Sequence, residues 1–349
     1  MRQRISVKDV AQYSKGQQIN GDDLIEDGQY DYLNGGINPS GKWSDYNVEG
    51  GTVTISEGGN SSGYINYMID PFWCGAHCYY LFNVKADSKY MYYALKSQQD
   101  RLMGIRSGAC MPNIKKTDLG NFEFNFDDDE IAQREVVFTL EKVEKVIASR
   151  KEELEQLDIL IKARFVEMFG DPVSNLFGLP EATLPELGEF GRGVSKHRPR
   201  NDASLLDGPY PLIQTGDVAN ARLYITEYHS TYSELGLKQS KMWDKGTLCI
   251  TIAANIAKTA ILDFDACFPD SVVGFNANEN TNNVFIHYWF SFFQEILESQ
   301  APESAQKNIN LKILRELKVI VPDIKKQNQF EDFVKQVDKS RFIHNMYTP

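Results

Sequence analysis

Apolar residues in the middle of the chain follow a regular pattern between Glu130 and Met168. They recur at alternating steps of four and three positions, and only Arg150 and Arg164 interrupt the series. The apolar positions are Val136, Leu140, Val143, Ile147, Leu154, Leu157, Ile161 and Met168. This spacing, kept over about four heptads, is typical of a coiled-coil seam. We therefore predict a long helix over residues 129–170; an ordinary amphipathic helix packed on its own domain is the alternative.

A shorter helical pattern occupies residues 323–349, where Phe330, Val334 and Val337 take the equivalent positions. If it runs antiparallel to the first helix, it covers mainly the part between Leu154 and Met168. An apolar stripe would then stay uncovered, and we expect a partner subunit or a second copy of the chain to cover it. The residues of this expected stripe are Val136, Leu140, Val143 and Ile147.

The rest of the sequence repeats itself at an interval of roughly 195 positions. The segment Gly51-Thr52-Val53-Thr54-Ile55-Ser56 corresponds to Gly246-Thr247-Leu248-Cys249-Ile250-Thr251, and Asn113–Leu119 corresponds to Asn308–Leu314. In both copies a short apolar strand follows, Phe122–Phe126 and Leu317–Val321. Each strand leads into the polar start of one of the two predicted helices.

Each repeat combines short β-rich runs, glycine turns and one expected helix near its end. The expected helices are Lys89–Arg101 and Val284–Leu297. The pattern predicts an α+β fold with two mixed, largely β domains, residues 1–128 and 171–322. Long helices separate these domains and form an antiparallel coiled coil.

The composition limits the class of protein. The 349 residues include 42% hydrophobic residues, enough to bury two cores, and the net charge is -11. This charge argues against a nucleic-acid ligand, although a local basic loop can dock DNA while partner subunits supply further phosphate contacts. No apolar run has the length of a membrane span, and the start lacks a signal peptide. We therefore expect a cytoplasmic protein whose five cysteines are reduced thiols.

The richest basic segment is the loop from Gly191 to Arg200. Its polar candidates for DNA contact are Arg192, Ser195, Lys196, His197, Arg198 and Arg200. Arginine pairs bidentately with guanine edges, and lysine and serine suit phosphates. The alternative is an ordinary solvated loop. In the first repeat the matching loop offers Lys15 and Gln17, and amides can pair with adenine edges.

A second pair of loops is small and polar. The first-repeat loop contains Asn60, Ser61, Ser62 and Tyr64, and its expected counterpart contains Asn255 and Lys258. Glycines beside the first loop would let its backbone approach a ligand closely. An ordinary hairpin turn is the alternative for each loop.

Motifs for catalysis or metal binding are not found. Cys74-Gly75-Ala76-His77-Cys78 lacks the second ligand pair that structural zinc needs, so buried thiols are the better interpretation. The sequence also has no Walker loop, and no Asn-Pro-Pro-aromatic motif of amino-methylating enzymes. We therefore expect no metal, no bound cofactor and no catalytic residue in this chain.

Several segments together resemble the specificity subunits of type I restriction-modification enzymes. Ala163–Pro172 is similar to the helix end of that family, and Gly193–Arg200 with Pro211–Val218 is similar to one class of its target recognition domains. Gly63–Asn66 with Pro71–Trp73 and His77-Cys78 is similar to another class, and Gln306–Asn310 to the segment before the second spacer helix. The second similarity adds Gln214 and Thr215 to the candidates for DNA contact.

The resemblance implies two target recognition domains that each read half of a split double-stranded DNA site. Spacer helices set the gap between the halves and dock two methyltransferase subunits, which use S-adenosylmethionine to methylate adenine. Restriction subunits that consume ATP and need Mg²⁺ join them. In the family the second spacer helix is usually about as long as the first. The shorter one here implies that the gene is naturally short, that the chain was cut, or that another chain supplies the missing part, and the last case allows self-association. The rival interpretations are a free-standing DNA-modifying enzyme and a decoy or assembly factor that binds methyltransferase subunits only.

Overall fold

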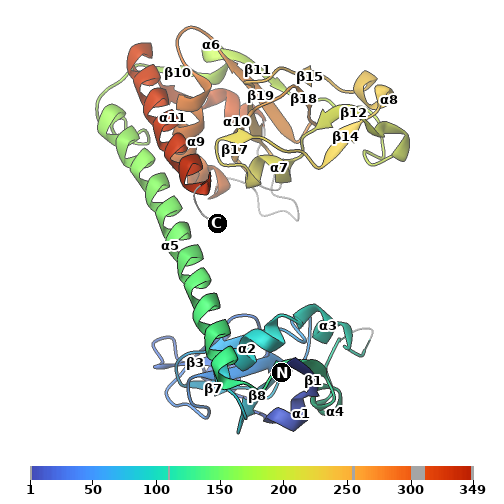
Figure 1. Cartoon of the computed structure of the whole chain (residues 1–349). Coiled ribbons are helices and arrows are strands. Elements are labelled where there is room, and N and C mark those ends of the chain that lie inside the picture. The colour runs from blue at the N-terminus through green and yellow to red at the C-terminus, as the bar shows by residue number, and fades with distance from the viewer. Residues whose placement is uncertain (1, 109–110, 254–255, 300–310, 347–349) are drawn as a thin grey trace. The chain divides into compact units, whose positions relative to one another are not determined.

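The computed structural model describes residues 2–108, 111–253, 256–299 and 311–346. The chain folds as two compact units, residues 1–150 and 151–349, and the long helix α5 (Glu130–Phe169) runs from the first unit into the second (Figure 1). The helix begins and ends within one residue of the predicted positions. Gly170 follows it with a φ of 76°, a conformation that favours glycine, and so provides the expected stop.

The described residues of the first unit form three small sheets. A four-stranded sheet has the order β2-β8-β5-β6, a three-stranded sheet has the order β4-β3-β7, and β1 pairs with β9. The strands are β1 (Arg2–Ser6), β2 (Gln12–Lys15), β3 (Tyr30–Leu33), β4 (Gly41–Trp43), β5 (Thr52–Ser56), β6 (Ile65–Met68), β7 (Phe72–Cys74), β8 (Cys78–Phe82) and β9 (Glu123–Asp127). The helices before α5 are α1 (Val7–Val10), α2 (Ser88–Lys96), α3 (Gln99–Gly104) and α4 (Lys116–Gly120), with a short 3₁₀ turn at Gly21–Asp23. The single helix expected at Lys89–Arg101 is thus divided into α2 and α3.

In the second unit the part of the chain that the structure describes also forms three sheets, ordered β11-β19-β16-β17-β13, β14-β12-β18-β15 and β10-β20. Its strands are β10 (Glu181–Thr183), β11 (Gly188–Arg192), β12 (Leu206–Leu212), β13 (Tyr224–Ile225), β14 (Ser230–Tyr232), β15 (Met242–Trp243), β16 (Leu248–Thr251), β17 (Thr259–Leu262), β18 (Ala266–Cys267), β19 (Val272–Ala277) and β20 (Lys318–Ile320). Its helices are α6 (Leu184–Leu187), α7 (Thr215–Asn220), α8 (Glu234–Lys238), α9 (Asn283–Ser299), α10 (Leu311–Glu316) and α11 (Ile324–Met346), with a 3₁₀ turn at Ala203–Leu205.

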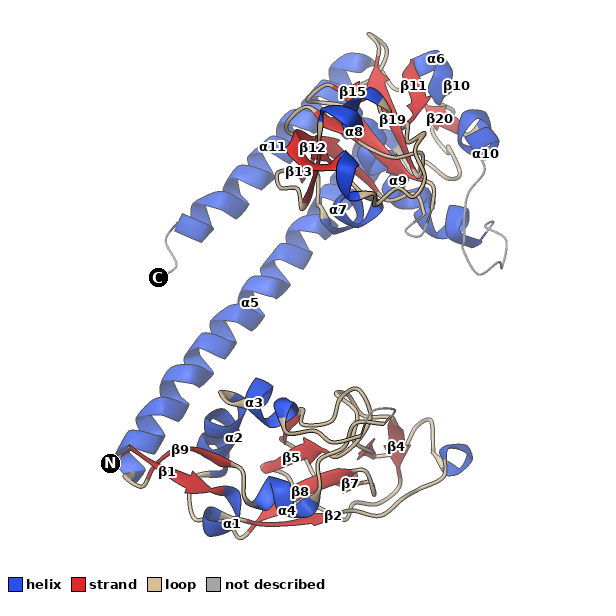
Figure 2. Cartoon of the chain, turned by 90° about the vertical axis from the view of Figure 1, so that its right-hand side faces the viewer, coloured by secondary structure: helices blue, strands red, loops and turns tan. Residues whose placement is uncertain are grey.

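The two units share one topology, which confirms the repeat in the sequence. In each unit the first strand pairs antiparallel with the last, as β1 with β9 and β10 with β20. The second strand pairs antiparallel with the strand of the main sheet that comes latest in the sequence, as β2 with β8 and β11 with β19. A parallel pair follows in the neighbouring sheet, β3 with β7 and β12 with β18. The repeated segments noted in the sequence form β5 and β16, and each unit ends on the strand that leads into α5 or α11. Figure 2 shows the strands of each unit together with their helices.

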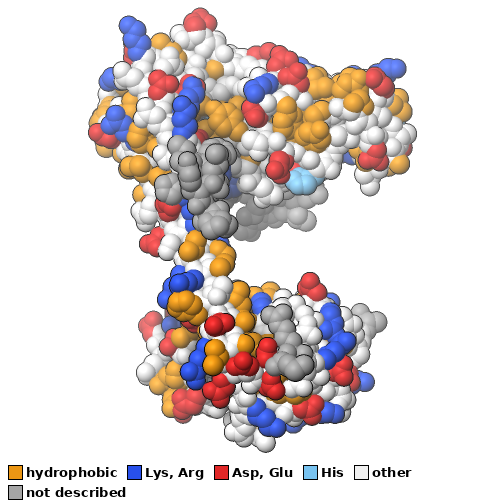
Figure 3. Space-filling view, in the orientation of Figure 1, with side chains coloured by type: hydrophobic (Ala, Val, Ile, Leu, Met, Phe, Trp, Pro, Cys, Tyr) orange, Lys and Arg blue, Asp and Glu red, His pale blue; other side chains and the backbone are white. Residues whose placement is uncertain are grey.

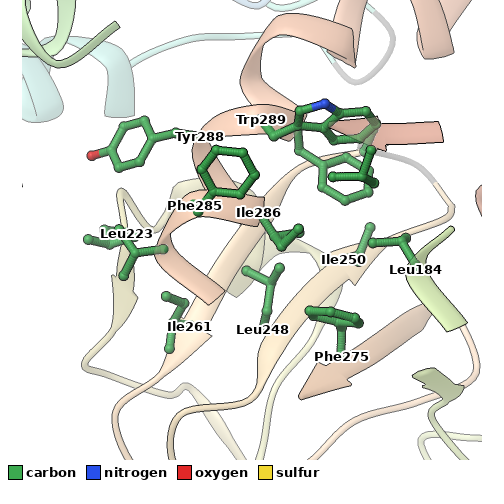
Figure 4. Close-up of a cluster of buried hydrophobic side chains, with 14 of the residues drawn as sticks. Leu184, Leu223, Leu248, Ile250, Ile261, Phe275, Phe285, Ile286, Tyr288 and Trp289 are labelled. Carbon is green, nitrogen blue, oxygen red and sulfur yellow. The ribbon is translucent and has the colours of Figure 1, made fainter. Parts of the chain in front are cut away.

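The core of the second unit forms where α9 packs on the central sheet. Phe285, Ile286 and Trp289 of α9 lie against Leu248, Ile250, Ile261 and Phe275 of the strands (Figure 4). Apolar residues dominate α9 on several faces, and a helix of that kind is expected to be buried. The first unit has its own core, in which α2 covers the sheet containing β5 and β8.

The second half of α5 packs into the core of the second unit. Phe165 and Phe169 are buried among the rings of Phe285 and Phe330, at centroid distances of 5.1 to 5.8 Å. Phe330 lies near the start of α11, whereas Arg341 near its end pairs with Asp158. The two helices therefore run antiparallel. Ile161 is buried as expected, but the predicted seam omitted the two phenylalanines, which contribute the largest buried side chains of this face.

The first half of α5 begins on the first unit. Val136 lies partly buried against that unit's core, so it does not belong to the exposed stripe predicted from the sequence. The remaining stripe residues have exposed fractions of 36% for Leu140, 49% for Val143 and 50% for Ile147. We call these three residues the α5 stripe. Figure 3 shows exposed hydrophobic side chains along this helix.

A buried glutamine joins each long helix to its unit, a contact that sequence reasoning did not identify. Gln133 of α5 donates to Asp127 O at 2.8 Å and accepts from Asp87 N at 3.2 Å. Gln327 of α11 donates to Pro322 O at 2.8 Å and accepts from Asn282 N at 3.3 Å. The two glutamines occupy equivalent places in the repeat. Because buried amides need all their partners, they fix how each helix leaves its unit.

His287 makes the stability of the second unit depend on pH. It lies partly buried on α9 with Nδ1 2.9 Å from Thr259 Oγ1, and burial lowers its pKa to about 4. In the unfolded chain its pKa is about 6.5, so only the unfolded state takes up a proton between these values. We therefore expect the free energy of unfolding to fall as pH drops from about 6.5 to about 4, by at most roughly 1.4 kcal/mol per pH unit.

The measurement is urea unfolding of the full chain at several pH values, followed by hydrogen exchange in peptides from β16 and β17. The variant His287→Asn keeps a polar partner for Thr259 but does not titrate. It should lose this part of the pH dependence, and an identical pH profile in both proteins would contradict the assignment.

Candidate nucleic-acid interface

The topology of each unit collects four loops at one end of its sheets. In the second unit β11, β12 and β16 end there, and the connection between β18 and β19 turns at the same place. We call the described residues of these loops the loop edge of the second unit; they are residues 193–201, 213–215, 252–253, 256–257 and 268–271. The loop edge of the first unit is formed by residues 16–19, 34–36, 57–63 and 75–77, which follow the equivalent strands.

A glycine at the same position of each repeat lets the loops of this edge approach one another. Gly193 follows β11, and a Cβ atom there would lie 2.3 Å from Pro269 O. Gly16 follows β2, and a Cβ atom there would lie 1.8 Å from Cys74 O. Any side chain at these positions would push the loop away from its neighbour. The close packing of the loop edges therefore depends on these two glycines.

A cavity of about 370 Å³ opens at the loop edge of the second unit. Arg200, Gln214 and Thr215 lie together around this cavity. All three were proposed from the sequence for DNA contact. The other lining residues are Asn201, Leu206, Leu212, Ser230, Tyr232, Ala253, Pro269 and Ser271. Apolar walls with a few fixed polar groups are what a binding site needs to orient a ligand.

The arginines of the basic loop converge on one residue, Asp270. Arg198 lies 3.4 Å from its Oδ2, Arg200 pairs closely with its Oδ1, and Arg192 Nε donates to its backbone oxygen. Arg198 also donates to Ser195 O at 2.6 Å and to His197 O at 2.8 Å, so it is largely occupied in holding the loop. Arg200 lines the cavity, and Asp270 is its hydrogen-bond partner among the described residues. Asp270 was not identified from the sequence, because a single carboxylate in a loop has no pattern.

The other candidates in the basic loop have different surroundings. Gln239 Oε1 accepts from the backbone of Lys196 at 2.7 Å and of His197 at 3.1 Å, and so fixes the loop. His197 Nε2 lies 3.3 Å from Asp202, while the Lys196 side chain is exposed. Ser195 is 7% exposed, which places it inside the loop and corrects its proposed role as a contact residue.

The candidates outside the basic loop differ in whether they lie at the cavity. Gln214 caps α7 and donates to Ser230 Oγ at 3.2 Å, so its amide is held at the cavity. Lys258 donates to Gln294 Oε1 of α9 at 3.0 Å, which directs it toward the unit's own helix instead of the cavity. Asn255 lies outside the described residues.

At the loop edge of the first unit the cation is also paired with a carboxylate. Lys15 Nζ contacts Glu57 Oε1, and His77 Nδ1 lies 3.4 Å from Glu57 Oε2. Gln17 is exposed, and its backbone oxygen accepts a 2.8 Å hydrogen bond from the Trp73 indole. Glu57 therefore has a role here like that of Asp270 in the second unit, and it was likewise not identified from the sequence.

The small polar loop of the first unit is mainly structural. Ser61 Oγ donates to Gly35 O at 2.7 Å, and the fully buried Ser62 donates to Glu57 O at 2.7 Å. Lys96 Nζ lies 3.8 Å from the centroid of the Tyr64 ring. Asn60 is exposed at the tip of the loop. Ser62 is thus corrected from a candidate contact to a turn residue, whereas Asn60 remains accessible.

The α5 stripe continues into a second cavity, which lies entirely within the first unit. This cavity has a volume of about 270 Å³ and is lined by Tyr90, Tyr93, Ala94, Ser97, Asn125, Asp127, Ala132, Val136 and Leu140. Tyr93 is held by a 2.7 Å hydrogen bond to Glu144 of α5. The apolar side chains of the stripe thus lie beside a cavity whose walls are both apolar and polar.

The cysteine segment behaves as expected for a structural element. Cys74 and Cys78 are buried, and the hydrogen bond with Cys78, together with burial, raises the pKa of the Cys74 thiol. Within the described ranges, no three His, Cys, Asp or Glu side chains are grouped so that they could hold a metal ion. None of the helices in the described part of the chain combines the length and apolar character needed to cross a bilayer.

Comparison with known proteins supports this architecture. The family model of the type I restriction modification DNA specificity domain matches residues 3–158 and again residues 181–346. A putative type I specificity subunit of Mycoplasma genitalium is 30% identical over 219 residues, which are 58% of this chain and 55% of that relative. A similar protein of Mycoplasma pneumoniae is 37% identical over 108 residues, 30% of this chain and 28% of the relative. The matched stretches thus span about half the length of these relatives or less.

Solved structures share the fold. The S subunit of a type I restriction-modification system from M. genitalium has a TM-score of 0.62 at 22% identity, covering 99% of this chain and 91% of that one. A chain from a study of complex assembly and conformational transition of a type I R-M system has a TM-score of 0.55 at 14% identity, covering 98% and 91%. With two matched domains and an internal repeat in its fold, the chain belongs to the family of type I restriction-modification specificity subunits.

Proposed function

We propose that the chain reads a bipartite double-stranded DNA target for a type I restriction-modification complex, each unit contacting one half through its loop edge. The observation that carries the proposal is the cavity bordered by Arg200, Gln214 and Thr215. A guanidinium fork and a fixed amide at one cavity match the acceptor and donor groups of bases in the major groove. The exposed Asn60 offers the corresponding contact in the first unit.

In this proposal the α5 stripe docks methyltransferase subunits, of which two would bind. These subunits would use S-adenosylmethionine to methylate adenine, and restriction subunits would add ATP- and Mg²⁺-dependent cleavage. The chain itself contributes recognition and assembly and no catalytic group. A decoy without DNA contact would need the stripe but not the cavity, so the two surfaces can be tested separately.

The experiment is coexpression of the chain with its methyltransferase subunits in a host without other adenine methylation, followed by sequencing of the methylome. We expect methylation in one split sequence of two fixed halves. The purified chain alone should neither methylate nor cut DNA. Methyl transfer by the isolated chain would support a free-standing enzyme and overturn the proposal.

Arg200→Ala should weaken binding to the cognate duplex by roughly 1–3 kcal/mol and relax one position of one half-site. The reason is that a bidentate arginine both binds a guanine edge and rejects the other bases. Titration of labelled duplexes and the methylome of the variant measure the two effects. Lys245→Ala is the matched control, since Lys245 pairs with Asp263 at 2.7 Å at the opposite end of the sheet from the loop edge. Unchanged affinity together with an unchanged methylation sequence would exclude Arg200 from base reading.

A further inference from the structure

Each loop edge pairs some of its cations with a carboxylate of its own. In the second unit the carboxylate of Asp270 is shared by Arg198 and Arg200, and its backbone oxygen accepts from Arg192. In the first unit Glu57 places one oxygen against Lys15 and the other near His77. The two carboxylates come from different loops of the repeat, Asp270 after β18 and Glu57 after β5. The same electrostatic arrangement is therefore built twice from unrelated sequence positions.

These ion pairs are partly exposed to solvent, and separating them costs little free energy. The side chains of Arg198 and Arg200 are 54% and 46% exposed, and that of Asp270 is 27% exposed. Pairs of this exposure contribute about 0–1 kcal/mol, so they add little to folding. They do, however, remove free positive charge from the surface that would face a duplex. Affinity for DNA of any sequence depends on such charge, because each neutralised phosphate releases counterions.

We propose that Asp270 and Glu57 compete with DNA for the cations of the two loop edges and thereby suppress binding to non-target sequences. The inference rests on the proposed function. On a non-target duplex, the phosphates either displace the carboxylates from the cations or lie close to their negative charge. No base contacts form there to compensate for this cost. On the target, contacts from the cavity compensate for separating the ion pairs. The carboxylates thus increase the ratio of specific to non-specific affinity at some cost in total affinity.

The test uses the full chain with Asp270→Asn, an isosteric change that removes the charge and keeps the backbone acceptor for Arg192. Binding to a 30-base-pair duplex of arbitrary sequence, about three helical turns of B-DNA, is measured from 50 to 200 mM salt. We expect the non-specific affinity at 50 mM to rise about tenfold and the slope of log K against log salt to steepen by about one. Binding to the cognate duplex should rise less, so discrimination falls.

Asp263→Asn is the matched control, because it removes the same charge from the same unit at the opposite end of the sheet. It should change non-specific affinity little. The triple variant Asp270→Asn with Arg198→Gln and Arg200→Gln should lose the gain, since both guanidinium groups that share the carboxylate are then absent. Glu57→Gln with the control Glu49→Gln repeats the test in the first unit. Thermal unfolding of each variant checks that the fold is kept.

Three results would overturn the inference. An equal gain in Asp263→Asn would show a general charge effect. A persistent gain in the triple variant would show that the arginines paired with Asp270 are not the groups released. Lower cognate affinity without any non-specific gain would show that Asp270 only positions the arginines. Failure of the proposed function gives a different result, because the wild-type chain with its partners would then not distinguish the cognate duplex from a scrambled one.

Discussion

Replacing Phe165 with alanine should destabilise the second unit by about 3–5 kcal/mol, the largest stability effect that we expect from one side chain. Phe165 is fully buried and lies within 5.3 Å, centroid to centroid, of Phe169, Phe285, Phe292 and Phe330. The substitution removes a ring from the point where α5, α9 and α11 meet. Because all three helices are held by this cluster, the surroundings cannot collapse into the space without separating the helices.

Urea unfolding of the full chain, followed by hydrogen exchange in peptides from α9 and α11, measures the effect. The control is Phe138→Ala, which removes the same side chain from the same helix at a position that is 61% exposed. The Phe138 ring contacts Lys142, whose Nζ lies 4.1 Å from the ring centroid. Loss of this contact should lower the free energy of unfolding by less than about 1 kcal/mol. Similar destabilisation by both variants would mean that the aromatic cluster does not hold the helices together.

The same cluster shows where sequence periodicity stops being informative. The pattern predicted the limits of α5 closely, since helix ends and apolar spacing are encoded in neighbouring residues. The pattern does not determine which face is buried, because the crossing of α9 over α5 decides this. An alternating four and three spacing selects Leu157 and Met168, both of which are only partly buried. Phe165 and Phe169 follow Ile161 in steps of four, and this is the row that the neighbouring helices cover.

The candidate site, like the buried face of α5, was only partly predictable from the sequence. The concentration of arginines in one loop and the internal repeat are properties of local sequence, and the structure places Arg200 and Gln214 at one cavity. Their partners are set by tertiary contacts across long separations in the chain. Asp270 lies 70 positions beyond Arg200, and Gln239 lies 43 positions beyond Lys196. Without the pairing of strands that brings these loops together, no spacing rule connects them.

A charge placed in the α5 stripe should abolish assembly with methyltransferase subunits while leaving the chain folded. Val143 and Ile147 lie four positions apart on one face of the helix and are about half exposed. Leu140 connects them to the cavity lined by Tyr90 and Tyr93. Apolar side chains of this size contribute about 1–2 kcal/mol each when a partner buries them. Val143→Glu or Ile147→Glu would instead bury an unpaired carboxylate, which costs several kcal/mol more.

Copurification of the chain with its methyltransferase subunits is the measurement, and a fall in affinity of at least about a hundredfold is expected from that free energy. Ser149→Glu is the matched control, because it adds the same charge to the same exposed helix. Ser149 lies nine residues after Leu140, so its side chain is on the opposite face of the helix, about 180° away. Hydrogen exchange of the free variants should equal that of the wild type, because the substituted residues are outside both cores. If Val143→Glu assembles as well as Ser149→Glu, the methyltransferase subunits bind elsewhere. Loss of assembly in both would mean that any added charge on α5 is disruptive, and the stripe would not be the specific docking surface.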